Sequence, residues 1–181
     1  MLVTGGALAG AATAILLLRA EPSLRVVIVE RAPSFGRRVG ESTVEVSAYF
    51  LSRVLGLTRY LQDAHIAKQG MRFWFANGET ETIADCSELG NRFQSRLPAY
   101  QVDRSTLDEE VLRRARELGA EVRREAAVKH VSLAPGGEQT VELHSAAGSE
   151  TVRARWVVDA SGRTALLARH RIGIDNIAWE C

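Results

Sequence analysis

Three glycines near the start of the chain and two acidic residues far apart in the sequence stand out by their types and spacing. Gly5, Gly6 and Gly10 lie between a short apolar run and a longer apolar segment. Glu30 ends a second apolar run about 25 positions after Gly5, and Asp159 ends a third. A glycine turn that opens a helix offers unpaired N–H groups and a positive dipole end to a pyrophosphate. A carboxylate at the end of the next strand accepts hydrogen bonds from a ribose diol, so these residues predict a site for an adenine dinucleotide.

The elements that must position these residues follow from the pattern around them. Residues 2–4 predict a short strand, residues 11–20 a buried helix, and residues 25–30 a second strand. The β-branched run in 25–30 lacks polar alternation, as in a strand buried on both faces of a parallel sheet. Residues 156–159 predict a further buried strand. We therefore expect both acids to lie with the glycine turn at the carboxyl edge of one parallel sheet.

One residue departs from the usual glycine pattern, and each feature also has a plainer interpretation. Ala7 occupies the position that normally holds the second glycine, where the backbone approaches the pyrophosphate. The glycines alone are consistent with a tight turn, Glu30 with a solvated strand end, and Asp159 with a helix cap. Their occurrence together favours the nucleotide site.

The rest of the chain predicts helices, short strands and a meander. Apolar residues recur at three- and four-residue steps within residues 40–68, which predicts a helix. Residues 71–75 predict a strand, and residues 105–119 a helix bounded by a capping-box-like start and a glycine. Glycine-containing turns separate three further candidate strands of an antiparallel meander, at residues 121–133, 139–144 and 150–155, the first of them with an irregular start.

Composition excludes several classes of partner. The chain of 181 residues has 23 Lys and Arg against 22 Asp and Glu, and a nucleic-acid or anionic-membrane surface needs a basic excess. Within the helix at 105–119, Glu109–Arg113 and Glu110–Arg114 have the spacing of ion pairs. The two cysteines and four histidines lack the spacing of metal ligands. We expect a cytoplasmic protein with no nucleic acid, membrane or metal partner.

Four motifs occur in the order and spacing of a known family. They are the glycine turn with Glu30, then Gly40-Glu41-Ser42, Tyr100–Arg104 and Asp159–Arg163. From residue 3 to about residue 169 the chain resembles the FAD-dependent monooxygenase superfamily, and within it the flavin-dependent, tryptophan halogenase-like branch. The resemblance implies FAD as the cofactor. It also implies a truncated α/β Rossmann-like fold with three layers in the order ββα. One β layer is a parallel sheet and the other is an antiparallel β-meander.

The resemblance assigns roles to individual residues. It implies that Glu30 holds the adenosine ribose, that Arg104 contacts the flavin nucleotide, and that Asp159 and Gly162 lie near the pyrophosphate. The loop of residues 40–42 is implied to pass close to the isoalloxazine ring. The candidate cofactor-binding residues are Gly5, Gly6, Ala7, Gly10, Glu30, Arg31, Gly40, Glu41, Ser42, Arg104, Asp159 and Gly162.

One lysine and three aromatic residues are candidates for the substrate side. Lys68 matches the lysine that halogenases of this type place between flavin and substrate, where an ammonium donates to hypohalous acid. The alternative is a lysine at a helix end that bonds the last carbonyls. In residues 73–75, Phe-Trp-Phe, one strand face suits a pocket for an aromatic substrate, and packing within a sheet is the alternative.

The family motifs that belong further along are missing, so we expect a fragment of a longer enzyme. Residues 1–42 and 103–181 are predicted to form the FAD-binding domain, and residues 43–102 an insertion toward the substrate side. We expect an FAD-dependent oxidoreductase of monooxygenase or halogenase type that uses reduced flavin and oxygen on a small organic substrate. A flavin reductase or NAD(P)H would then be the electron source.

Two other functions remain as alternatives. A non-catalytic FAD-binding fragment is consistent with the truncation and with Ala7. A nicotinamide-dependent reductase of the short-chain type needs a Tyr-x-x-x-Lys pair, and none of the three tyrosines has a lysine four residues later.

Overall fold

The computed structural model describes residues 1–76, 78, 80–90 and 97–172. By its internal contacts the chain divides into two compact units, Met1–Arg37 with Ser105–Cys181, and Arg38–Arg104. The functional division into a cofactor domain (1–42 and 103–181) and a substrate-side insertion (43–102) stays a prediction.

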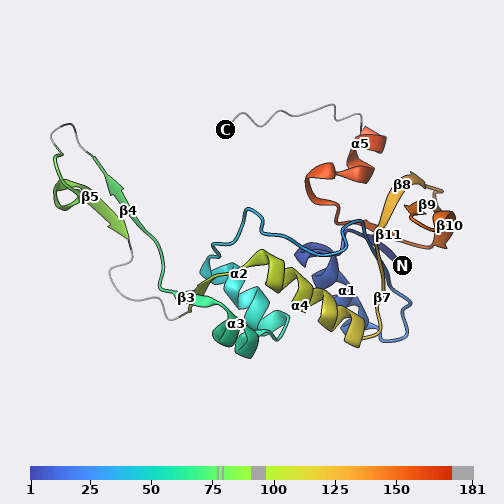
Figure 1. Cartoon of the computed structure of the whole chain (residues 1–181), viewed down its shortest axis with the longest axis horizontal. Coiled ribbons are helices and arrows are strands. Elements are labelled where there is room, and N and C mark those ends of the chain that lie inside the picture. The colour runs from blue at the N-terminus through green and yellow to red at the C-terminus, as the bar shows by residue number, and fades with distance from the viewer. Residues whose placement is uncertain (77, 79, 91–96, 173–181) are drawn as a thin grey trace. The chain divides into compact units, whose positions relative to one another are not determined.

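A four-stranded parallel sheet forms the centre of the first unit, and Figure 1 labels its two edge strands, β7 and β11. Its order is β11-β1-β2-β7. The strands are β1 (Leu2–Thr4), β2 (Val27–Glu30), β7 (Glu121–Arg124) and β11 (Val157–Asp159). Thr4 is in register with both Val29 and Asp159. The predicted convergence of the glycine turn and the two acid-tipped strands on one sheet edge is therefore confirmed.

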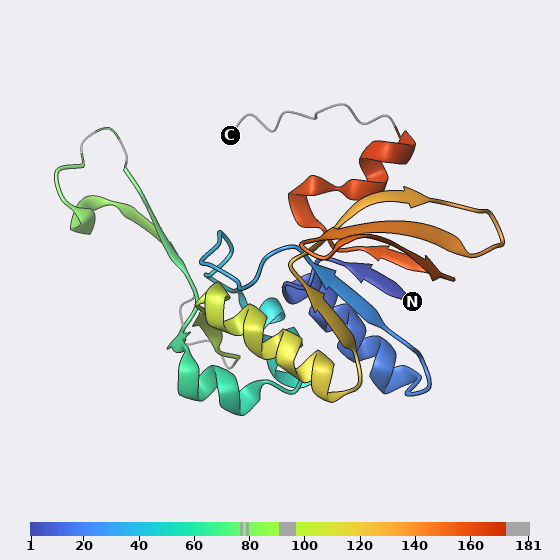
Figure 2. The same cartoon turned by 45° about the vertical axis from the view of Figure 1, so that its right-hand side comes forward.

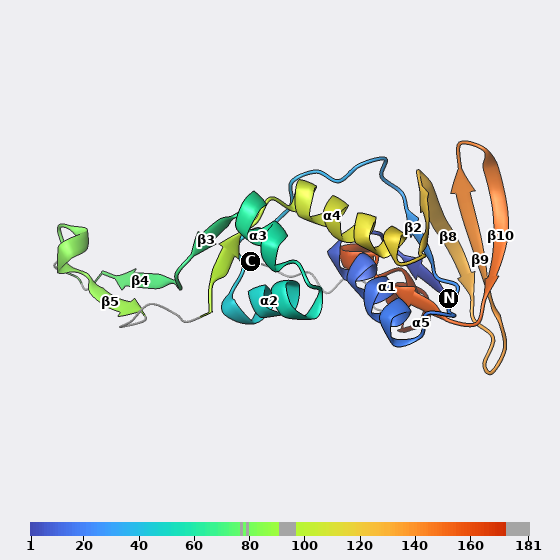
Figure 3. The ribbon, with the colours of Figure 1, turned by 90° about the horizontal axis from the view of Figure 1, so that it is seen from below.

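Helices and a second sheet cover the two faces of the parallel sheet. Figure 3 shows α1 (Leu8–Ala20) and α4 (Arg104–Glu117) on one side and the strands β8, β9 and β10 on the other. These strands, Ala126–Ser132, Gln139–Ser145 and Gly148–Ala154, form an antiparallel meander (Figure 2). Leu2 and Val29 of the parallel sheet pack with Val141 and Leu143 of the meander. The unit thus has the expected ββα layers, and it continues after β11 into η3 (Gly162–Thr164) and α5 (Leu166–Ile172).

The prediction of one strand over residues 121–133 is wrong. Residues 121–124 form β7 in the parallel sheet, and β8 begins at Ala126 in the other sheet. Between them Glu125 has φ +54°, a left-handed conformation that redirects the chain from one sheet to the other. The expected irregular start of this segment is thus a change of sheet, and its position at Glu125 was not predicted because a non-glycine residue rarely adopts this conformation.

The second unit contains short helices, a small pair of strands and a hairpin. The helical segments are α2 (Glu45–Tyr49), a π-helical turn η1 (Phe50–Val54), α3 (Thr58–Ala64) and the 3-10 turn η2 (Ile83–Asp85). The antiparallel strand pairs are β3 (Ile66–Lys68) with β6 (Ala99–Gln101), and β4 (Arg72–Phe75) with β5 (Ser87–Gly90). The predicted helix over residues 40–68 is therefore wrong at both ends: helix begins only at Glu45, and residues 66–68 are strand.

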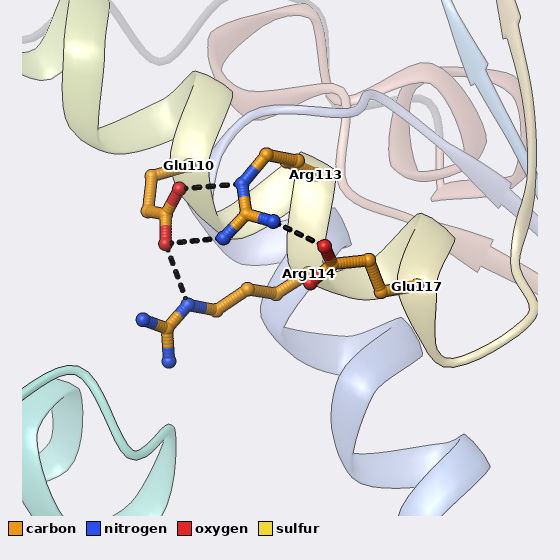
Figure 4. A network of polar contacts seen from close by, with 4 residues as sticks. All are labelled: Glu110, Arg113, Arg114 and Glu117. Carbon is orange, nitrogen blue, oxygen red and sulfur yellow. Dashed lines mark hydrogen bonds and ion pairs between the residues drawn. The ribbon is translucent and has the colours of Figure 1, made fainter.

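The outer face of α4 carries balanced charge (Figure 4). The Glu110 carboxylate accepts hydrogen bonds from Nε of Arg113 and from Nε of Arg114, both at 2.7 Å, and Arg113 also contacts Glu117. The bond from Arg113 is the main reason that the pKa of Glu110 lies below its ordinary value. The predicted Glu110–Arg114 pair is confirmed, and this run of arginines is not an uncompensated basic patch.

Within the described part of the chain, no helix combines the length and the apolar character needed to cross a membrane.

Candidate functional site

Gly5, in the turn between β1 and α1, and Gly10, in the first turn of α1, are packed too tightly to accept side chains. Gly5 has φ +95°, and its N–H donates to the carbonyl of Val29 at 2.8 Å. A Cβ on Gly5 would lie 2.4 Å from the carbonyl oxygen of Ala160. A Cβ on Gly10 would lie only 1.8 Å from the carbonyl oxygen of Gly5. Both positions therefore require glycine, and residues 5–10, termed the cradle below, are closely packed.

The carboxylate of Glu30 lies against this turn. Its Oε2 accepts a hydrogen bond from the N–H of Gly6 at 2.8 Å, and its Oε1 accepts one from the N–H of Ala32 at 2.9 Å. Glu30 is only 6% exposed. The plainer interpretation of Glu30 as a solvated strand end is therefore wrong. An ionised carboxylate has about four acceptor positions, and these two bonds occupy two of them.

The N-terminus of α1 opens at the same turn. Ala7 is the N-cap residue with extended backbone, no side chain caps the helix there, and its first turn has no acidic residue. The positive end of the helix dipole is therefore not compensated by a neighbouring carboxylate of that turn. Arg31, the residue after Glu30, is exposed. The arrangement offers N–H groups and a dipole to an anion, and a carboxylate to neighbouring hydroxyls.

Asp159 forms bonds within its own segment of the chain. Its Oδ1 accepts from the N–H of Ser161 at 3.0 Å, and its Oδ2 from the N–H of Leu167 in α5 at 2.8 Å. Burial alone would raise the pKa of Asp159, but a hydrogen bond from the Ser161 side chain, together with these two backbone bonds, outweighs burial and holds the pKa below its ordinary value. The interpretation as a helix cap is therefore correct. A role for Asp159 and for Gly162, at φ +64°, near a pyrophosphate stays a prediction.

In the second unit, the structure brings together the other predicted cofactor contacts. The carbonyl of Glu41 accepts from the N–H of Val102 at 2.7 Å, and its side-chain Oε1 accepts from the N–H of Arg104 at 3.2 Å. A Cβ on Gly40 would lie 3.5 Å from Nη1 of Arg104. Residues 40–42 and the start of α4 are thus held side by side within this unit.

Lys68 belongs to the same cluster. Its Nζ donates to Oγ of Ser42, and Ser42 itself forms a β-bridge with Gln101. Lys68 is the last residue of β3 and pairs with Ala99 of β6, so the alternative of a helix-terminal lysine is wrong. It lines a cavity of about 190 Å³ together with Glu45. Its catalytic role stays a prediction.

The aromatic residues of β4 are not buried by sheet packing. Phe73, Trp74 and Phe75 are 49%, 45% and 55% exposed. The alternative of packing within a sheet does not account for these side chains in the described part of the chain. Their assignment to an aromatic-substrate pocket stays a prediction.

Sequence patterns did not single out Arg124, which lies beside the candidate site at the end of β7. Its guanidinium contacts the carboxylate of Glu109 and the carbonyl of Pro33, in the loop after Glu30. The predicted ion pair between Glu109 and Arg113 is therefore wrong, because Glu109 is engaged by Arg124. The register of β7 beside β2 brings Arg124 opposite Glu30, and this register is not readable from local spacing.

The chain is similar in sequence to FAD-binding and flavin-dependent proteins. The model of a family described as FAD-binding domain matches residues 1–179. The flavin-dependent halogenase chlA of Dictyostelium discoideum is 29% identical, over 97% of this chain and 35% of that protein. The flavin-dependent halogenase armH5 of Armillaria mellea is 26% identical, over 98% of this chain and 36% of that protein. The chain thus spans about a third of the length of these curated relatives.

Solved structures share the fold. The myxobacterial chondrochloren halogenase CndH, described as a FAD-dependent halogenase, superposes with a TM-score of 0.76 and 27% sequence identity, over 91% of this chain and 37% of that one. The predicted Rossmann-like α/β fold and the predicted cofactor FAD are confirmed by these comparisons.

Proposed function

The chain belongs to the family of FAD-binding domains, and we propose that its first unit holds the adenosine diphosphate half of FAD in a flavin-dependent oxidoreductase of halogenase type. The family match over nearly the whole chain and the similarity to flavin-dependent halogenases support this proposal.

The observation that carries the proposal is the contact between Glu30 and the glycine turn. The Gly6 N–H bond fixes one carboxylate oxygen beside the turn while acceptor positions remain for a ribose diol. The glycines fit the dinucleotide pattern, because a Cβ at Gly10 would meet Gly5 and Val3, which is the close packing of helix against strand that the last glycine of this pattern allows. Backbone N–H groups at the start of α1 would face the pyrophosphate, with Ala7 as the residue of closest approach.

The second unit supplies the residues that we propose for the flavin and substrate side. The bound flavin would provide the oxidation and reduction chemistry, and the chain would hold and orient it. Gly40, Glu41, Ser42 and Arg104 are the proposed flavin contacts, and Lys68 is the proposed catalytic residue, whose ammonium donates to an oxidised halide. The bond from Lys68 to Ser42 supports this role because it fixes the position of the ammonium.

The proposed substrate is a small organic molecule, and the exposed aromatic residues of β4 favour an aromatic one. A flavin reductase or NAD(P)H is the proposed electron source, and the cytoplasm the proposed location. Hydroxylation by the same flavin module is the second candidate reaction, as the resemblance to FAD-dependent monooxygenases implies.

Titration of the full chain with FAD tests the proposed function. We expect FAD fluorescence to be quenched on binding, and Glu30→Gln to weaken binding by about tenfold or more, because a hydrogen bond to a charged group contributes about 1.5–3 kcal/mol. The matched control is Glu138→Gln, which changes an exposed carboxylate outside the cradle. Urea denaturation of each variant separates a loss of binding from a loss of folding. No FAD binding by the wild-type chain, or equal affinity of both variants, would overturn the proposal.

A further inference from the structure

The loop after β2 is fixed by an arginine that the proposed cofactor contacts do not include. We propose that Arg124, together with Glu109, is a positioning residue that holds this loop so that the Glu30 carboxylate faces the ribose diol. The inference deepens the proposed function and rests on it.

Arg124 makes four separate contacts with its surroundings. Its Nη1 donates to the carbonyl of Pro33 at 2.9 Å and, more weakly, to that of Ala32 at 3.4 Å. Its Nη2 donates to Oε2 of Glu109, and the guanidinium lies 4.6 Å from the centroid of the Phe35 ring. Its side chain is only 18% exposed, so these contacts are largely shielded from water. A planar guanidinium can satisfy two carbonyls and a carboxylate at once, which a lysine ammonium on its flexible stem does less well.

Glu109, on helix α4, binds both Arg124 and the loop, and we call this pair of residues the clamp. While its Oε2 receives Arg124, its Oε1 accepts the N–H of Phe35 at 3.0 Å. Phe35 is only 5% exposed, so the far end of the loop is anchored by burial as well. The loop is therefore held at three backbone groups: the carbonyls of Ala32 and Pro33 and the N–H of Phe35.

Ala32 links this clamp to Glu30. Its N–H donates to Oε1 of Glu30 at 2.9 Å, and its carbonyl accepts from Arg124. Displacement of the loop would remove one of the two N–H donors that orient the Glu30 carboxylate. The strand register also sets Arg124 directly opposite Glu30. The effect of Arg124 on a ribose would thus pass through Ala32 and Glu30.

The neighbouring arginine provides a matched control. Arg123 forms ion pairs with Glu121 and Glu150, which both lie outside the loop after β2. Successive residues of a strand point to opposite faces, so the two arginines differ in surroundings but not in charge.

The test compares ADP with 2′-deoxy-ADP as ligands of the full chain, by calorimetric titration. The wild-type chain should bind ADP about tenfold more tightly than 2′-deoxy-ADP, because the deoxy ligand lacks a hydrogen bond to a charged carboxylate. In Arg124→Met this ratio should fall to between about one and three, and in Arg123→Met it should stay near the wild-type value. If Glu30 is misoriented, the affinity for ADP falls more than the affinity for 2′-deoxy-ADP, so their ratio changes. A general loss of stability lowers both affinities together and leaves the ratio unchanged.

The possible outcomes separate the two proposals. A wild-type ratio near one would overturn the ribose role of Glu30 and with it this inference. A wild-type ratio near ten that persists in Arg124→Met would overturn the positioning role alone. Should Arg124→Met fail to fold, Arg124→Lys keeps the charge without the planar fork, and we expect its ratio to be at least threefold below that of the wild type. An unchanged ratio in Arg124→Lys would then refute the role.

Discussion

Replacement of Gly10 by alanine probes whether the cradle depends on close backbone packing. Gly10 has no unusual backbone angle, so the substitution introduces a steric change without backbone strain. The added Cβ would lie 1.8 Å from the carbonyl oxygen of Gly5 and 3.1 Å from Cγ1 of Val3. The nearest of these atoms belongs to the backbone of the turn, so relief requires the turn to separate from α1.

We expect Gly10→Ala to lower the free energy of unfolding by about 3 kcal/mol, the upper end for overpacking a well-packed site. For a chain of this size each kcal/mol corresponds to roughly 2–4 °C in Tm, so the Tm should fall by roughly 6–12 °C. Affinity for FAD should fall as well, because the displaced turn is the proposed pyrophosphate cradle.

Two other glycines separate the steric effect from backbone strain. Gly136 has φ +73° and open space around its Cβ position, so Gly136→Ala should cost about 1–2 kcal/mol from the left-handed conformation alone. Gly36 has neither feature, and Gly36→Ala should change stability by less than about 1 kcal/mol, in the stabilising direction.

Differential scanning calorimetry with urea denaturation of the four chains measures these effects. If Gly10→Ala and Gly36→Ala unfolded at the same temperature, the turn would accept the added methyl group. The prediction from the short distance to the Gly5 carbonyl would then be refuted.

Two further predictions concern titratable groups. Nδ1 of His65 accepts the N–H of Asp103 at 3.3 Å, and burial lowers the pKa of His65. The unfolded chain therefore binds more protons, and the free energy of unfolding should decrease as the pH falls below about 6.5. Urea denaturation at pH 7.5 and 5.5 should show a smaller decrease for His65→Asn, which keeps an acceptor but takes no proton. Asp159→Ala should lower the free energy of unfolding by about 0.5–2 kcal/mol, because a helix cap is lost. The Leu167 amide should then exchange its hydrogen faster. Unchanged exchange of this amide would contradict the capping role.

The sequence was sufficient where a local pattern dictates the structure. The glycine turn and the β-branched run ending at Glu30 define a βαβ unit within thirty residues, and the structure has this unit. The same reasoning failed at Glu125, where one residue at positive φ divides an apparent strand between two sheets. It also failed at residues 66–68, whose conformation depends on pairing with β6, more than thirty residues away. Arg124 was missed for a similar reason, since its role depends on strand register.

The two acidic strand ends carry different weight as indicators of a ligand. Asp159 bonds N–H groups two and eight residues further along, which any loop that leads into a helix can require of an aspartate. Glu30 instead bonds Gly6, 24 residues away, and is buried in doing so. Burial of a carboxylate costs free energy unless hydrogen-bond donors compensate it. The bond to the glycine turn joins two distant parts of the chain, so the local path of the backbone at Glu30 does not explain it. A carboxylate held at that position repels a 2′-phosphate, so Glu30 rather than Asp159 is the residue at which the choice of nucleotide should be tested.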